Sequence, residues 1–290
     1  MIIGKAISPF ALRKKGTAVV PTDADAQLFI TATGISGTNA TATNQLVIDL
    51  KAANIWTKMK AIYPMVGGTA TTCKFNLKDS RDLNAAYRLT FFGGGTFSSN
   101  GYQSNGTNSY ADTFLIPSTA FANTNNHLSF YSRTSANVGI TDMGAYWTNS
   151  PATNPSTYTA VYSFGVGRSI DTNAVGYLSN DDTNRIQYTQ TNASGMFVLS
   201  RTANNSLKMY QNNILKQTNT VVASSVFNTL PQNSIFIGAT NYRDSGTVSV
   251  LQYSAKQCAF ASIGDGLTDA EALALYNAVN AFQVSLARNV

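Results

Sequence analysis

The sequence predicts a mainly β protein: an antiparallel sandwich, preceded by a small helical element and closed by a C-terminal helix. From residue 69 to residue 265, short runs rich in β-branched and aromatic residues alternate with turn signals such as Gly93-Gly94-Gly95 and Asn105-Gly106. Of the 290 residues, 12% are charged, 43% are hydrophobic and 11% are aromatic. Because Ser, Thr, Asn, Gln and Gly supply the polarity, this composition indicates exposed β-structure with polar turns and excludes a disordered chain.

Residues 1–21 form a basic and apolar arm that we expect to dock on a partner. Its apolar residues are Ile2, Ile3, Ile7, Phe10 and Leu12, and its basic residues are Lys5, Arg13, Lys14 and Lys15. The arm has no acidic residue and contributes +4 of the formal net charge of +6. A nucleic-acid-binding domain would spread such charge over a folded face, so we expect no nucleic-acid partner. The arm could fold into an acidic groove on binding; the alternative is a disordered terminus.

Residues 22–68 carry a helical signal. Thr22 or Asp23 can cap a first helix, which Gly34 ends. A second helix is expected to begin near residues 39–43. Its apolar stripe runs through Leu46, Val47, Leu50 and Ile55, with Trp56, Met59 and Ile62 extending the same face as far as Pro64.

Residues 69–290 are expected to form the sandwich and its closing helix. In the run 206–211, Leu207 and Met209 should point to one side of a strand, and Lys208 and Tyr210 to the other. Residues 258–263 fit a last strand, and Gly264-Asp265-Gly266 permits a sharp turn with positive φ.

The ending of the chain predicts an amphipathic helix. Thr268-Asp269-Ala270-Glu271 has the pattern of a capping box, in which Thr268 and Glu271 each bind the other's backbone amide. The apolar seam of the helix that follows comprises Ala272, Leu275, Val279, Phe282 and Leu286.

This ending resembles that of concanavalin A-like and laminin-G-like jelly-roll domains. Residues 207–213 are similar to a strand and turn of those domains, with Asn213 in place of the usual Gly, and residues 235–239 are similar to a further strand. The resemblance is best over the last third of the chain. It implies a concanavalin A-like antiparallel jelly-roll sandwich.

A further resemblance is to jelly-roll structural proteins of tailed-bacteriophage virions. It rests on residues 55–68, 76–82 and 256–260, and on Ile3-Gly4-Lys5-Ala6-Ile7-Ser8-Pro9, which matches an N-terminal peptide common in that group. It implies a virion protein such as a head fibre, a capsid decoration or a tail-associated protein, anchored by the arm on capsid or tail proteins. Such fibres are usually symmetric homo-oligomers, and residues 22–62 could supply the contact.

The expected location of the protein in the cell and on the virion is inferred from the same resemblance and from the N-terminal residues. The apolar runs at the N-terminus are short and precede the basic cluster, so we expect no signal peptide. No segment approaches the roughly 18 apolar residues of a membrane span, so no membrane insertion is expected. The protein would be made in the host cytoplasm and displayed on the virion surface.

The acidic residues argue against catalysis. Glycosidases of related fold need two carboxylates about 5 to 9.5 Å apart. This chain has a single glutamate, Glu271, for which the capping box already accounts. The single histidine, His127, begins a predicted strand, and we expect a surface or cross-strand residue there and not a general base. We therefore expect a non-enzymatic protein without catalytic residues.

The alternative function is a tail-associated receptor-binding or carbohydrate-binding module that recognises host surface glycans. The candidate glycan contacts are Tyr146, Trp147, Tyr158, Tyr162 and Tyr242, which lie in or near predicted loops. Buried sandwich positions explain these aromatic residues equally well.

No cofactor is expected. Calcium is common at the rim of related folds, and the best cluster for it is Asp181-Asp182 with Asp171 or Asn180; an ordinary turn is the alternative. Cys73 and Cys258 lack metal-ligand spacing. We expect two buried thiols, with a disulfide as the alternative.

Overall fold

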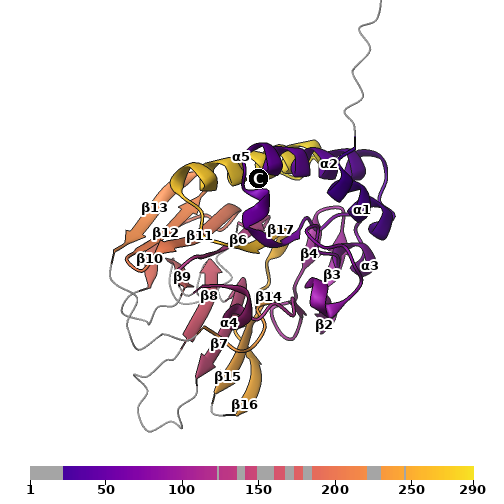
Figure 1. The fold of residues 1–290 in the computed structure, drawn as a ribbon. Coiled ribbons are helices and arrows are strands. Elements are labelled where there is room, and N and C mark those ends of the chain that lie inside the picture. The colour runs from indigo at the N-terminus through magenta and orange to yellow at the C-terminus, as the bar shows by residue number, and fades with distance from the viewer. Residues whose placement is uncertain are drawn as a thin grey trace, which may run out of the picture.

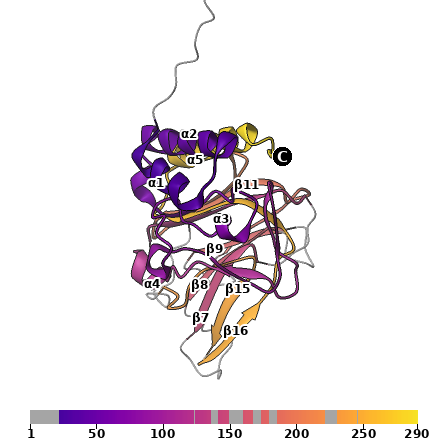
Figure 2. The same cartoon turned by 90° about the vertical axis from the view of Figure 1, so that its right-hand side faces the viewer.

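Two β-sheets packed face to face form the body of the protein, and helices cover the outer side of one of them. The computed structural model describes residues 22–122, 124–135, 141–148, 160–166, 173–178, 185–220, 230–244 and 246–290. In Figure 1, helices α1 (Ala24–Thr33), α2 (Gly37–Ala52) and α5 (Asp269–Ser285) lie together above the sheets. Figure 2 shows the same layers from the side, with β15 (Thr240–Asp244) and β16 (Thr247–Leu251) reaching farthest from the helices.

The first sheet has eight strands within the described residues, and its strand pairs are antiparallel. Its path runs β13 (Ile214–Asn219), β12 (Ser206–Gln211), β11 (Gly195–Ala203), β6 (Asn126–Ser132), β17 (Gln257–Gly264), β4 (Gly101–Gln103) and β3 (Thr96–Ser98), with β1 (Met59–Tyr63) also paired to β17.

The second sheet has nine strands within the same described ranges. Its path runs β10 (Ile186–Thr189), β9 (Asn173–Leu178), β8 (Ala160–Val166), β7 (Met143–Thr148), β14 (Phe236–Ile237), β5 (Tyr110–Asp112) and β2 (Thr90–Phe92). The hairpin of β15 and β16 joins it through a parallel pairing of β15 with β7. Short helices are η1 (Trp56–Lys58), α3 (Ala70–Cys73), η2 (Asn84–Ala86) and α4 (Pro117–Ala120). None of the helices in the described ranges is long and apolar enough to cross a bilayer.

Side-chain alternation places the first sheet between two apolar layers. On β12, Leu207 and Met209 are buried between the sheets, while Tyr210 packs in the layer beneath the helices. On β6, Leu128 is likewise buried between the sheets, and Tyr131 packs in the layer beneath the helices. The predicted alternation is confirmed, and so is the fold class: mainly β, with two largely antiparallel sheets packed as a sandwich, an N-terminal helical element and a C-terminal helix. The concanavalin A-like jelly-roll topology stays a prediction.

The N-terminal helical element agrees with its predicted caps. The side chain of Asp23 accepts a hydrogen bond from the amide of Asp25 at 2.9 Å, and Gly34 ends α1 with a φ of 69°. The apolar sides of α1 and α2 pack within this chain, on α5 and the first sheet. Leu28 is an exception, with 63% of its surface exposed. Homo-oligomerisation through this segment stays a prediction.

The expected continuation of the second helix is wrong. The helix ends at Ala52, Asn54 has a positive φ of 58°, and Met59–Tyr63 is strand β1. Both faces of β1 are buried, because Ala61 contacts the core between the sheets and Ile62 contacts the layer under the helices. Burial on both faces made the apolar spacing of these residues similar to a helical stripe. The sandwich therefore includes β1 and begins before residue 69.

The C-terminal helix is capped as predicted. The amide of Glu271 donates to Thr268 Oγ1 at 3.4 Å, and the amide of Thr268 donates to Glu271 Oε2 at 2.9 Å. The seam is buried through Phe282, and Leu286 lies just beyond the end of the helix at Ser285.

The turn before this helix needs glycine for a different reason from the one expected. Neither Gly264 nor Gly266 has a positive φ. A Cβ on Gly264 would instead overlap the carbonyl oxygen of Lys58, and one on Gly266 would overlap that of Arg201. Close approach of the backbone, and not left-handed geometry, selects glycine at both positions.

Candidate functional site

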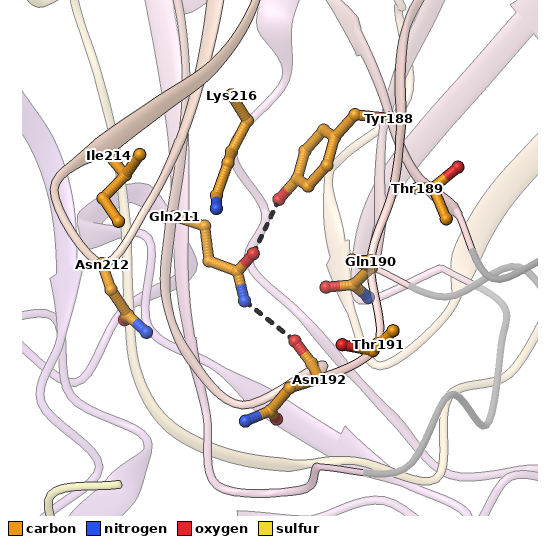
Figure 3. A pocket seen from close by; sticks show the side chains of 9 residues that line it. All are labelled: Tyr188, Thr189, Gln190, Thr191, Asn192, Gln211, Asn212, Ile214 and Lys216. Carbon is orange, nitrogen blue, oxygen red and sulfur yellow. Dashed lines mark hydrogen bonds between the residues drawn. The ribbon is translucent and has the colours of Figure 1, made fainter.

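A polar pocket lies at the edge of the sandwich, where the last strands of the two sheets come together. Strand β13 ends the first sheet, β10 ends the second, and the two are in contact. The pocket between them has a volume of about 310 Å³ (Figure 3). We call it the edge pocket. Its walls come from β10, the loop at residues 190–192, and the hairpin of β12 and β13.

The lining of the edge pocket is dominated by hydroxyl and amide groups. Tyr188 is partly buried with its ring against the core, and Thr189 and Thr191 are exposed. Gln190 and Asn192 add side-chain amides from the following loop. Such groups both donate and accept hydrogen bonds, so the pocket suits a ligand rich in hydroxyl groups.

The amide of Gln211 is held in one orientation at the wall of the pocket. Tyr188 Oη donates to Gln211 Oε1 at 3.1 Å, and Gln211 Nε2 donates to the carbonyl oxygen of Asn192 at 2.8 Å (Figure 3). Gln211 has only 9% of its surface exposed. Burial raises the pKa of Tyr188, so its hydroxyl stays protonated and remains a donor. These contacts join the two sheets across the pocket.

The turn between β12 and β13 fixes the rim of the edge pocket. Asn212 and Asn213 have positive φ values of 48° and 66°, a conformation that Asn tolerates in tight hairpins. Asn212 Oδ1 accepts the amide of Met196 on β11 at 2.8 Å. A Cβ on Gly195 would overlap the side chain of Asn212, so glycine there admits this contact. Asn213 therefore replaces glycine without loss of the turn.

Lys216 supplies positive charge to the edge pocket. It is exposed on β13, and Figure 3 shows its ammonium end turned toward the side of the pocket that holds Gln211 and Tyr188. The lining residues within the described part of the chain include no carboxylate.

Of the five residues predicted to contact a glycan, the structure brings Tyr146 and Tyr242 into contact with each other. Tyr146 and Tyr242 stack on β7 and β15, with ring centroids 4.5 Å apart and planes 9° from parallel. Trp147 has 7% of its surface exposed and offers little area to a sugar. Tyr158 and the side chain of Tyr162 lie outside the described residues. The stacked pair is separated from β10 by two strands of the second sheet and is not part of the edge pocket.

Sequence reasoning missed both the edge pocket and a row of aromatic rings on the outer face of the second sheet. Phe92 and Tyr110 stack with centroids 4.9 Å apart, and Tyr110 and Phe236 with centroids 4.5 Å apart. The residues of each set come from segments far apart in the chain. The polar run 187–192 was the available local signal for the edge pocket.

His127 lies in a buried network without access for a substrate. Its Nδ1 lies 2.6 Å from the carbonyl oxygen of Asp265, and its Nε2 lies 3.1 Å from Ser262 Oγ, which lies 2.6 Å from Ser129 Oγ. His127, Ser129 and Ser262 have no exposed surface. Burial, with a smaller effect from the charge of Lys58, lowers the pKa of His127 to about 4. The network joins β6 to β17, the cross-strand role expected for this histidine.

Glu271 performs the capping role predicted for it. Besides the backbone amide, its carboxylate pairs with Lys58 Nζ at 2.6 Å. Desolvation raises its pKa, but the bonds from Lys58 and Thr268 outweigh this effect and lower it. The carboxylate is therefore engaged at the start of α5.

The remaining predicted sites are the two cysteines, the candidate calcium ligands and the residues of the N-terminal arm. Cys73 and Cys258 are buried free thiols, as favoured, and burial raises the pKa of Cys73 to about 11. No group of three or more His, Cys, Asp or Glu side chains in the described ranges could hold a metal ion. The calcium candidates lie outside those ranges, as do all the arm residues: Asp171, Asn180, Asp181, Asp182, Ile2, Ile3, Lys5, Ile7, Phe10, Leu12, Arg13, Lys14 and Lys15.

Comparison with known proteins gives distant structural likenesses. No protein-family model and no curated protein matches the sequence. The chain is similar to the binding domain of botulinum neurotoxin serotype D, with a TM-score of 0.48 and 10% identity over 77% of this chain and 52% of that one. It is also similar to domain 4 of AbnA, an extracellular arabinanase from Geobacillus stearothermophilus, in complex with arabinotriose, with a TM-score of 0.43 and 14% identity over 75% of this chain and 98% of that one.

The chain thus spans about half the length of the neurotoxin domain that it matches. Likenesses at this level of identity and TM-score carry no argument about function.

Proposed function

We propose that this chain is a non-enzymatic binding module that recognises a saccharide of a host cell surface through the edge pocket. The observation that carries this proposal is the fixed amide of Gln211 beside the hydroxyl of Tyr188, in a pocket otherwise lined by threonines and amides. Sugar hydroxyls need donors and acceptors at set positions, and a pre-organised polar lining supplies them at low entropic cost.

A non-enzymatic role has its own support. The single glutamate is engaged by Lys58 and by the start of α5, and the histidine is buried beneath the helices. The described residues that line the edge pocket include neither a carboxylate nor a histidine, so none of them can perform acid–base chemistry on a glycosidic bond in the way that a glycosidase carboxylate does.

A glycan array followed by calorimetry tests the proposal. Tyr188→Phe removes one hydroxyl and frees the Gln211 amide, and we expect the affinity for the bound saccharide to fall about 3- to 10-fold. Tyr146→Phe is the matched control, since it removes a tyrosine hydroxyl outside the pocket. Binding that responds to Tyr146→Phe and not to Tyr188→Phe would move the site to the stacked tyrosines. No saccharide binding by the intact protein would refute the proposal.

We also propose that residues 1–17 anchor this module on a tailed-phage virion, as a head fibre, capsid decoration or tail-associated protein. Support comes from the basic and apolar pattern of the arm and from the resemblance of residues 3–9 to an N-terminal peptide of virion proteins. Helix α1 begins at Ala24 with its own cap, so deletion of residues 1–17 spares every described element. We expect the truncated protein to fold, shown by an unchanged melting temperature, and to be absent from purified particles. Full incorporation of the truncated protein would contradict the anchoring role.

A further inference from the structure

The charge of the edge pocket points to the class of saccharide. Lys216 is the one charged residue among the described residues that line the pocket. The other lining groups are neutral hydroxyls, amides and one isoleucine. A lining whose described residues supply an ammonium group and no carboxylate favours an anionic ligand over a neutral one of the same shape.

Lys216 differs from the other lysines in the described ranges. Lys51, Lys58, Lys60, Lys74, Lys208 and Lys256 each lie in an ion pair with an aspartate or glutamate. Lys78 lies 4.0 Å from the centroid of the Trp56 ring. Among the described lysines, Lys216 alone has neither an acidic partner nor an aromatic one. An ammonium group without a protein partner is available to a ligand at no cost of breaking an ion pair.

Lys216 is placed so that it and the neutral groups of the pocket could contact the same ligand. It extends from β13, while Tyr188 and the loop at 190–192 stand on the β10 side of the pocket. A sugar ring between the two walls would present hydroxyl groups to the amides and an acidic substituent to Lys216. A carboxylate forms a stronger hydrogen bond with a charged donor, such as the ammonium group of Lys216, than with a neutral donor.

We propose that the edge pocket recognises a saccharide that carries a carboxylate, with Lys216 as the residue that selects it. This inference rests on the proposed saccharide-binding function. Sialic acids and uronic acids both supply the required group, and the charge alone does not separate them. A sulfate ester would supply the same charge, and the test below compares a sulfated sugar with the two acids.

The test compares each acidic sugar with its own methyl ester, which keeps the shape and removes the charge. Sialyllactose and a galacturonic acid disaccharide, each as acid and as methyl ester, are titrated into the full-length protein by calorimetry at low salt. We expect one of the acids to bind about 5- to 20-fold more tightly than its ester. The preferred acid identifies the source of the carboxylate. We also expect the preference to shrink as salt is raised, since the ammonium is exposed.

Two variants assign the preference to its residue. In Lys216→Gln the ratio of acid to ester affinity should fall to about one. In Lys208→Gln, which removes a lysine of the neighbouring strand outside the pocket, the ratio should match that of the parent protein. An equal ratio in the parent and in Lys216→Gln would overturn the inference, and so would tighter binding of a sulfated sugar than of either acid.

The two proposals fail in different ways. If acids and esters bind equally well and Tyr188→Phe weakens both, the saccharide pocket stands and the acidic preference is wrong. If none of the four ligands binds and the glycan array is blank, the saccharide-binding function itself is refuted.

Discussion

Acidification should destabilise this protein through His127, and the size of the effect follows from its burial. The side chain has no exposed surface, and its pKa falls from 6.5 to about 4. Desolvation is the main cause and the charge of Lys58 a smaller one, while the carbonyl oxygen of Asp265 acts in the opposite direction. The imidazole is therefore neutral in the folded protein throughout the mildly acidic range.

The direction of the effect follows from proton linkage. Between about pH 4 and 6.5 the unfolded chain binds a proton at His127 that the folded protein does not bind, so the free energy of unfolding rises with pH in this window. The contribution is complete above the unfolded pKa and is lost as the pH falls toward the folded value. A shift of roughly 2.5 pKa units corresponds to about 3 kcal/mol.

Urea denaturation followed by tryptophan fluorescence measures this dependence. Between about pH 7 and pH 4 we expect the free energy of unfolding to drop by about 3 kcal/mol more in the unmodified protein than in His127→Gln. Because the chain has a single histidine, its ring resonances also report the folded pKa directly in an NMR titration of the unmodified protein. A folded pKa near 6.5, or identical pH profiles for the two proteins, would refute the reasoning.

Two further predictions concern the packing of the chain ends and turns. Arg288 is buried and donates hydrogen bonds to the carbonyl oxygens of Pro64 at 2.6 Å and Ala259 at 2.8 Å. Arg288→Met should therefore lower the free energy of unfolding by about 3 kcal/mol or more in denaturant titrations. A loss below about 1 kcal/mol would show that these carbonyl oxygens find other partners. Gly266→Ala should lower the free energy of unfolding by about 2 kcal/mol or more in the same assay, because the added Cβ would overlap the carbonyl oxygen of Arg201. An unchanged denaturation midpoint would show that the turn can move away.

Local signals in the sequence were sufficient for some elements. The cap at Asp23, the stop at Gly34 and the capping box of Thr268 and Glu271 involve residues within a few positions of one another. The alternation of Leu207 and Met209 likewise depends only on the two-residue period of a strand. These features are determined by the chain over short distances, so they could be predicted without knowledge of the fold.

Elements that depend on a distant partner could not be predicted in this way. Strand β1 forms because Met59–Tyr63 pairs with β17, about two hundred residues later in the chain. Its burial on both faces gave an apolar spacing that equally fits a helix. Gly264 and Gly266 indicated a turn, but the crowding by Lys58 and Arg201 that requires glycine is visible only in the folded protein.

The sequence by itself determined the fold class, the caps and the absence of a glutamate pair for glycoside hydrolysis. The tertiary structure alone decided that Tyr188 and Gln211 meet, because Tyr188 lies on β10 of the second sheet and Gln211 on β12 of the first. It also decided that Lys216 lines a pocket without an acidic partner among the described residues, whereas lysines such as Lys208 and Lys256 are in ion pairs. The physical reason is that caps and alternation arise from neighbours in the chain, whereas a pocket between sheet edges arises from packing that brings distant segments together.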